Sequence, residues 1–318
     1  MTIADFLRLS WDEPGDALIQ PPPGSPIVAD PSFLFPNETP DGRWALVAHD
    51  AWGLRLYRSV DGRSWDRGSR IIRHAMRPFI RRLGAEYRLY FERYRPFALA
   101  MTALPLRPLW RSSVVGAASA DLTRWRGLVE LVAPEPAWMR DARLGLAASN
   151  PCLAEDGDAW RLYFSASLAW IDDCGFCEPR AIGCAASNDP LGPFLVHPLP
   201  LIDPDRQPEL APLGAGSLKA FKLDDGWIGL QNTIYRDGGG KSRSAIFILR
   251  SEDGYSWRKA REEPLLAPGS GWTASHVYAC DCRRDEADGS WYLYFNARDA
   301  WTMARGRERI GRIVGRPR

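Results

Sequence analysis

Short runs of hydrophobic residues, each about five residues long and ended by turn-forming residues, recur along the chain. One of these runs consists of an aromatic residue, one further residue and then two or three mostly apolar residues. Its five copies are RWALVA from Arg43, EYRLYF from Glu86, AWRLYF from Ala159, GWIGLQ from Gly226 and SWYLYF from Ser290. Runs of this length and composition are typical of β-strands. Their recurrence predicts a repeat architecture built from strands.

A second motif follows four of these copies and begins with Ser-x-Asp. It reads SVDGRSW from Ser59, SADLTRW from Ser119, SNDPLGPF from Ser187 and SEDGYSW from Ser251. Asp followed by Gly, or by a Pro-Leu-Gly sequence, is typical of a tight turn between two antiparallel strands. The motif therefore predicts an outer hairpin in each repeat, with the closing Trp or Phe packed between neighbouring sheets.

A third motif precedes each aromatic run. It reads DPSFLF from Asp30, RPFIRR from Arg77, NPCLAE from Asn150, SLKAFK from Ser217 and HVYACDC from His276. In the middle three repeats its first residue lies ten positions before the aromatic residue, which indicates a shared register. We expect these segments to be the innermost strands, and their first residues to converge on one central cavity.

Five units of four antiparallel strands predict an all-β fold, a five-bladed β-propeller that occupies residues 1–318 as one domain. The blades begin near residues 30, 77, 150, 217 and 276. The fifth unit lacks the Ser-x-Asp hairpin, whereas the N-terminal segment repeats the Ser-Trp-Asp sequence of blade one at Ser10. We therefore expect residues 1–20 to supply the strand that closes the last blade.

The balance of charges narrows the class of partner. The chain has 41 Lys and Arg residues against 39 Asp and Glu residues, a formal net charge of +2. Such a balance predicts neither a nucleic-acid nor a membrane partner, and favours a small-molecule or carbohydrate ligand. No apolar stretch is long enough for a membrane span or a signal peptide, so we expect a cytoplasmic protein with six reduced cysteines.

Motifs for phosphate loops, dinucleotides, zinc proteases and serine hydrolases are missing from the sequence, so no cofactor is predicted. The cysteine spacing suggests a four-thiolate zinc site made of Cys174, Cys177, Cys280 and Cys282. The predicted topology argues against it, because it places one pair in a loop at the cavity and the other pair farther along an inner strand. We therefore predict no metal site.

The motifs resemble the five-bladed glycoside hydrolases of family 43 and their relatives. The resemblance is carried by Ala29-Asp30-Pro31 at the start of blade one and by SNDPLGPF in blade three, and it covers roughly residues 27 to 300. It implies a glycoside hydrolase with three acids in an axial pocket, of which Asp30 matches the general base. Asn150 stands where the helper acid is expected, and the general acid of blade four falls near Gly216 or Ser217.

A second carboxyl group is needed, because one residue activates water while another protonates the leaving oxygen. If each inner strand begins at the pocket, each second strand ends there, and the loop that follows it lines the rim. Glu178 in the rim loop of blade three is our candidate for the missing acid, beside Asp30 as the base. The predicted substrate-binding residues are His49, Asp50, Arg77, Asn150, Ser217, His276 and Arg298.

Two interpretations of function remain open at this stage. The first is a glycosidase that acts on a sugar or a glycosylated small molecule. The alternative is a repurposed or inactive propeller that binds a small molecule or catalyses a non-hydrolytic reaction, which the loss of acids at Asn150 and Ser217 favours. The apolar segment 93–112 is expected to cover the pocket or to meet another subunit; the sequence predicts no oligomeric state.

Overall fold

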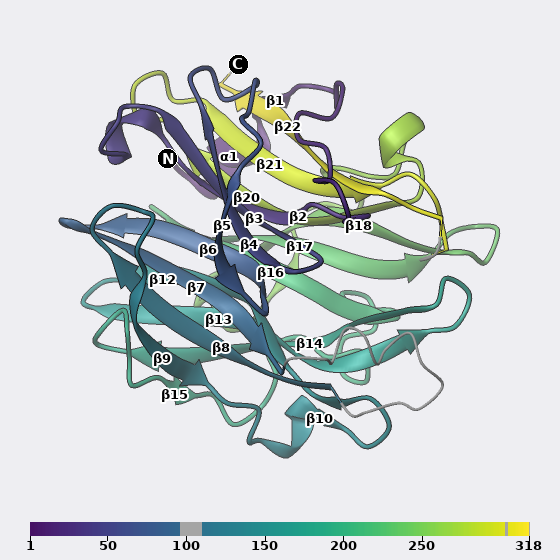
Figure 1. The fold of residues 1–318 in the computed structure, drawn as a ribbon. Helices are drawn as coiled ribbons and strands as arrows, with labels where there is room; N and C mark the ends of the chain where they lie inside the picture. Colours follow the sequence, from purple (N-terminus) through teal and green to yellow (C-terminus); the bar gives the residue numbers. More distant parts are fainter. Residues whose placement is uncertain (96–109, 303–304, 318) are drawn as a thin grey trace.

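The repeated short strands form five antiparallel sheets within the described residues, which are 1–95, 110–302 and 305–317 of the computed structural model. Figure 1 shows the sheets arranged as blades. In each blade the strands are given from the axis outward. Blade one consists of β2 (Ala29–Leu34), β3 (Trp44–Asp50), β4 (Gly53–Ser59) and β5 (Ser69–Arg73), and blade two of β6 (Ala75–Leu83), β7 (Glu86–Tyr94), β8 (Trp110–Ser119) and β9 (Arg126–Val132). Blade three consists of β12 (Ala148–Asp156), β13 (Ala159–Ile171), β14 (Phe176–Ser187) and β15 (Leu195–Val196), blade four of β16 (Gly214–Leu223), β17 (Gly226–Arg236), β18 (Ser242–Ser251) and β19 (Arg258–Lys259), and blade five of β20 (His276–Arg284), β21 (Trp291–Arg298), β22 (Glu308–Arg316) and β1 (Ser10–Trp11). The prediction of an all-β, five-bladed propeller is confirmed.

In the described residues, helical structure is limited to short elements. They are α1 (Ile3–Leu7) and the 3-10 turns η1 (Pro36–Glu38), η2 (Ala137–Met139) and η3 (Gly271–Thr273), while β10 (Arg140–Asp141) and β11 (Gly145–Leu146) extend the sheet of blade two. Across the described part of the chain, no helix has the length and apolar character needed to cross a membrane.

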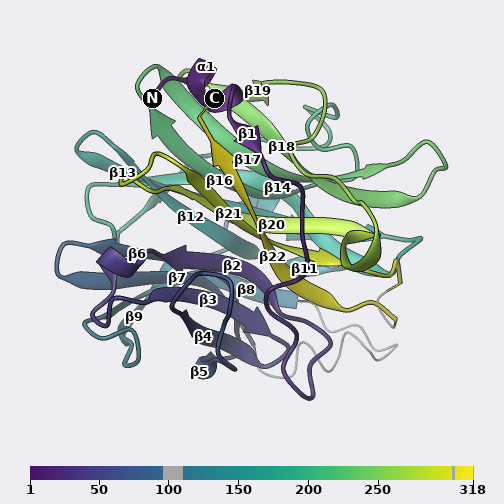
Figure 2. The ribbon, with the colours of Figure 1, turned by 90° about the horizontal axis from the view of Figure 1, so that it is seen from above.

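The N-terminal segment closes the ring, as Figure 2 shows by the position of β1 beside β22 near the two termini. Ser10 pairs with Arg316 and Trp11 with Gly315, and a further bridge joins Ile19 to Ile310. A Cβ atom at Gly315 would lie 2.8 Å from the indole of Trp11, so glycine allows the ring to pack flat on the strand. The prediction that residues 1–20 close the last blade is confirmed.

The apolar core lies between neighbouring blades, where each sheet buries both faces. The cluster between blades one and two contains Val47 and Leu89, and the cluster between blades five and one contains Phe33 and Tyr294. Since both faces are covered, the strands are continuously apolar instead of alternating. This burial explains why the aromatic runs were visible in the sequence.

Each inner strand contains a β-bulge near its pocket end. In blades one to three the bulge holds Asp30, Arg77 and Asn150, with positive φ angles of 53°, 54° and 47°. Each is followed by a proline, which lacks the N–H group that a regular ladder would use. A bulge redirects a side chain out of the alternating pattern. The X-Pro pairs therefore account for the local backbone that presents these three residues together at the same end of their blades.

Candidate active site

The site is built around Asp30 and His49, which lie at the pocket end of blade one. Asp30 Oδ2 lies 2.8 Å from His49 Nε2, and the register Ala29 to His49 places both residues at the same end of the sheet. The backbone N–H of Asp30 donates to Asn296 Oδ1 at 3.1 Å. Blade five thus holds Asp30 in its strained conformation, an arrangement common at functional sites.

Asp30 is kept ionised by its surroundings. Burial alone would raise its pKa, but the hydrogen bond with His49 and the charges of His49, Arg77 and Lys219 outweigh burial and lower the pKa. The pKa of His49 is raised, because the contact with Asp30 outweighs the effect of burial. Oδ1 of Asp30 has no hydrogen-bond partner among the described residues. This oxygen is available to accept a proton from a water molecule.

Glu178 has the opposite properties. It lies in β14, and not in the loop after β13 where we expected it, because β14 already begins at Phe176; it is only 9% exposed. Its carboxyl group makes no hydrogen bond or ion pair with any described residue. Burial raises its pKa to about 8, helped by the negative charges of Glu308 and Asp30 and opposed by Arg77 and Arg298. Glu178 is therefore protonated at neutral pH while Asp30 is ionised.

A third carboxyl group, Glu308 at the start of β22, belongs to the same cluster. It accepts a hydrogen bond from Asn296 Nδ2 at 2.9 Å and forms an ion pair with Arg298 at 3.2 Å. Burial raises its pKa and the negative charge of Asp30 adds to this rise, against the effects of Arg298 and His49. Sequence analysis missed Glu308. One feature of the sequence could have indicated Glu308: it is the first residue of the segment ERIGRIV, in the last strand of the chain.

Arg77 supplies positive charge on the blade-two side of the cluster. Its guanidinium group pairs with Glu92, whose other oxygen accepts from the indole N–H of Trp110 at 3.2 Å. Burial would lower the pKa of Arg77, but Glu92 and Asp30 outweigh burial and raise it. Arg77 thus remains cationic beside Asp30 and Glu178, where it is suited to contact hydroxyl groups or a developing negative charge.

The blade-five side of the cluster is aromatic. His276 stacks on Tyr278 with ring centroids 5.5 Å apart, and Arg298 lies over the ring of Phe176 at 4.7 Å. The hydroxyl group of Tyr278 is buried without a hydrogen-bond partner among the described residues. Burial, with Arg243 and Arg298, lowers the pKa of His276 to about 4, so its imidazole is neutral at pH 7.

The register expected for blade five is wrong. His276 begins β20 but pairs regularly with Arg298, and the bulge comes later, between Val277 and Cys280. Tyr278 therefore occupies the bulge that corresponds to Asp30. The displacement was invisible in the sequence, because blade five has no X-Pro pair to mark its bulge.

The other predicted binding residues have different surroundings. Asn150 is buried in its bulge with Nδ2 3.4 Å from Ser149 Oγ, and Ser217 follows a bulge that contains Gly216. A Cβ atom at Gly216 would lie 2.0 Å from the Asn232 carbonyl oxygen, which excludes a carboxylate side chain there. The oxygens of Asp50 are taken up by Arg70, at 2.9 Å each, and by backbone N–H groups of the next turn.

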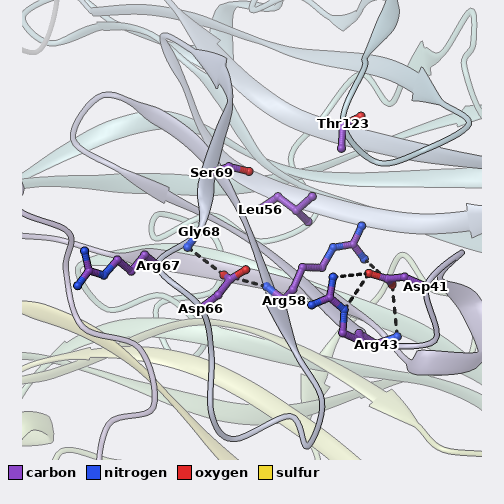
Figure 3. A pocket seen from close by; sticks show the side chains of 9 residues that line it. All are labelled: Asp41, Arg43, Leu56, Arg58, Asp66, Arg67, Gly68, Ser69 and Thr123. Atoms are coloured by element: carbon purple, nitrogen blue, oxygen red, sulfur yellow. Dashed lines mark hydrogen bonds and ion pairs between the residues drawn. The ribbon is translucent and has the colours of Figure 1, made fainter.

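Two features identified in the sequence lie outside this cluster. The central part of segment 93–112, residues 96–109, lies outside the described residues. Cys174 and Cys177 lie in the hairpin of blade three and Cys280 and Cys282 in β20; the described residues contain no cluster of ligands suited to a metal ion. A separate cavity of about 450 Å³, shown in Figure 3, opens among the outer strands of blade one near Thr123. Its Asp41 is paired with Arg43 and Arg58, and none of the three clustered acids lines it.

No protein-family model and no curated protein matches the sequence. Solved structures do match in fold. A family 117 glycoside hydrolase from Zobellia galactanivorans is 15% identical, with a TM-score of 0.59, over 97% of this chain and 89% of that one. A thermostable family-43 glycoside hydrolase is 12% identical, with a TM-score of 0.60, over 90% and 89%. An N-acetylgalactosamine deacetylase from F. plautii, in complex with blood group B trisaccharide, is 13% identical, with a TM-score of 0.60, over 96% and 95%.

These likenesses show the fold. The chain has the five-bladed fold of glycoside hydrolases and of other propellers that act on carbohydrates. The fold expected from the family-43 resemblance is thereby confirmed. Since unrelated reactions share one fold, the reaction has to be argued from the site itself.

Proposed function

We propose that the protein is a glycoside hydrolase in which Asp30 is the general base and Glu178 the general acid. The feature that carries this proposal is that burial and neighbouring charges shift the pKa values of two carboxyl groups in one cluster in opposite directions, down for Asp30 and up for Glu178. Environments that separate the pKa values of two acids in this way are how glycosidases assign the two roles. Glu178 replaces the carboxyl groups that the sequence lacks at Asn150 and Ser217.

The reaction follows from the free atoms of the two groups. Oδ1 of Asp30 takes a proton from a water molecule, which attacks the anomeric carbon of the sugar. The bond from that carbon to the leaving oxygen breaks, and the proton of Glu178 passes to this oxygen. His49 holds Oδ2 and keeps Asp30 ionised. Because water attacks directly, we expect inversion at the anomeric carbon.

Two variants test the assignment. With glycosyl fluorides, whose leaving group needs no proton, Asp30→Asn should lower kcat/KM by about 10²-fold or more while Glu178→Gln has little effect. With alkyl glycosides or oligosaccharides both variants should lose activity. Asp41→Asn, which changes a partly exposed carboxylate in the turn between β2 and β3, at the other end of blade one from Asp30, is the matched control. Equal sensitivity of Glu178→Gln to both kinds of leaving group would exclude Glu178 as the acid.

A second candidate function is a carbohydrate-binding propeller without hydrolytic activity. The absence of carboxyl groups at Asn150 and Ser217, two positions where the resemblance implies acids, favours it. In that case the wild-type protein would hydrolyse no member of a panel of glycosyl fluorides and aryl furanosides and pyranosides. It would nevertheless gain thermal stability with a sugar of the panel, and the gain would depend on Asp30.

A further inference from the structure

The turn between β3 and β4 presents an exposed indole beside the proposed catalytic pair. Trp52 is 60% exposed, although large apolar side chains usually pack against other residues. Trp52 lies three residues after His49, so their Cα atoms are at most about 11 Å apart. The same end of blade one carries the contact between His49 and Asp30. The indole therefore stands at the rim of the candidate site.

The turn that carries Trp52 is held rigidly. Oδ1 of Asp50 accepts the backbone N–H groups of Trp52 at 2.8 Å and of Gly53 at 3.1 Å. Asp50 is itself fixed by two hydrogen bonds from Arg70. A Cβ atom at Gly53 would lie 2.2 Å from the Ile72 carbonyl oxygen, so this close approach requires glycine. Asp50 thus anchors this turn, and a contact of Asp50 with substrate stays a prediction.

The orientation of the indole is also defined. Its Nε1 atom donates to the Gly24 carbonyl oxygen at 3.3 Å. The segment that contains Gly24 continues to Ile27, which bridges to Glu308 of the acid cluster. The Nε1 edge of the indole thus faces residues 24–27. Most of the Trp52 surface remains exposed to solvent. A fixed aromatic surface binds at low entropic cost, because few side-chain rotations are lost.

A neighbouring residue, His74, combines exposure with a strained backbone. His74 has a φ angle of 54°, is exposed, and donates its N–H to the Trp52 carbonyl oxygen at 3.3 Å. Its ring packs edge-on against Tyr94, with centroids 6.1 Å apart. Non-glycine residues in this conformation are costly and cluster at ligand sites. Blades one and two therefore offer an aromatic rim next to the acids.

We infer that Trp52 is a stacking platform for a second sugar ring, beyond the ring held between Asp30 and Glu178. Sugar rings present an apolar face of C–H groups, which packs favourably on an indole. The inference rests on the proposed function and names its substrate class: an oligosaccharide or glycan of at least two residues, with His74 beside the second residue. A single sugar would leave the indole exposed.

The platform is tested with two kinds of substrate, glycosyl fluorides and oligosaccharides, that share the sugar whose bond is cleaved. A glycosyl fluoride carries no group that reaches Trp52, whereas the corresponding disaccharide and trisaccharide do. Trp52→Ala should leave kcat/KM for the fluoride unchanged and lower it roughly 10-fold or more for the oligosaccharides, through KM. Trp52→Phe should retain most of the activity. Leu195→Ala, which removes an exposed apolar side chain from blade three, is the matched control.

The outcomes separate the platform from the hydrolase proposal. Equal losses on fluoride and oligosaccharides, or no loss on either, would overturn the platform and leave hydrolysis standing. If no substrate is hydrolysed, calorimetric titration of the wild-type and Trp52→Ala proteins with the same oligosaccharides decides. Binding that weakens at least 10-fold in the variant would support the platform and overturn only the hydrolase. No binding to the wild-type protein, or equal binding to both proteins, would overturn both proposals.

Discussion

The imidazole of His49 and the carboxylate of Asp30 lie 2.8 Å apart, and each shifts the pKa of the other toward its charged form. The pair is nearly enclosed, with 7% and 15% of the two side chains exposed. An ion pair removed from water in this way needs further partners to be stable. Arg77 and Lys219 lie within electrostatic range of Asp30, and Asn296 holds its backbone. Asp30 is thereby presented as a base that remains ionised below neutral pH.

Replacement of His49 should move the acidic limb of the activity profile. In His49→Gln the positive charge is lost, so the pKa of Asp30 rises and activity should begin to fall at a higher pH than in the wild-type protein. We expect the midpoint of this limb to move up by about 1 pH unit or more. The measurement is kcat/KM for a glycosyl fluoride between pH 3 and 8, with His197→Gln in the outer part of blade three as the control. An unchanged acidic limb would show that His49 does not tune Asp30.

Replacement of Glu178 should increase stability in a pH-dependent way. Its pKa of about 8 in the folded state lies above the ordinary value of 4.5, so folding favours the neutral form. The wild-type protein therefore loses stability as the pH rises from about 4.5 to 8, while Glu178→Gln has no such group to ionise. The Tm difference in favour of the variant should grow over this range. A Tm difference independent of pH would contradict the raised pKa.

Removal of the Tyr294 hydroxyl group should weaken the contact between blades five and one. Tyr294 donates to the Gly62 carbonyl oxygen at 2.6 Å, from blade five to the Ser-x-Asp turn of blade one. Tyr294→Phe should lower the free energy of unfolding by about 1 kcal/mol, measured by urea denaturation. Tyr292→Phe is the control, because the Tyr292 hydroxyl donates to no described residue. Equal stability of the two variants would show that this contact adds nothing.

The buried pair of Asp281 and Arg81 should make stability sensitive to acid. Burial would raise the pKa of Asp281, but Arg81 and other partners lower it to about 2. Its stabilising effect is thus complete above the ordinary value of 3.8 and is lost as the pH falls toward 2. Asp281→Asn should lower the free energy of unfolding by about 3 kcal/mol at pH 7, and by less as the pH falls from 4 to 2. Asp158→Asn, an exposed carboxylate, should change neither value.

Much of the fold could be predicted because its signals are local. The turn of blade one illustrates this: Ser59 Oγ accepts the Gly62 N–H at 2.9 Å, and Asp61 accepts the N–H groups of Arg63 and Ser64. These contacts span three residues or fewer, so the sequence of the turn specifies them. The same holds for the X-Pro bulges that display Asp30, Arg77 and Asn150.

The motifs did not reveal how the blades recognise one another. Tyr90, Tyr163 and Tyr294 each reach the turn of the next blade, at Pro190, Gly254 and Gly62. Blade one has Val47 at the corresponding position, and the next turn there has Leu122 in place of glycine, in the same apolar cluster as Val47. Val47 and Leu122 are 75 residues apart in the sequence, so their place in one apolar cluster could be recognised only in the folded ring of blades.

The sequence by itself determined the five blades, the closing N-terminal strand and the presence of Asp30 at the pocket end, because strand period, turn chemistry and proline act over a few residues. The sequence offered Glu178 as a candidate acid, but only the tertiary structure decided that Glu178 and Glu308 lie near Asp30. Glu178 comes from the third strand of its blade and Glu308 from the last strand of the chain, and ring closure brings both near Asp30. Their protonation was also beyond the sequence, because a pKa depends on burial and on charges supplied by several blades at once.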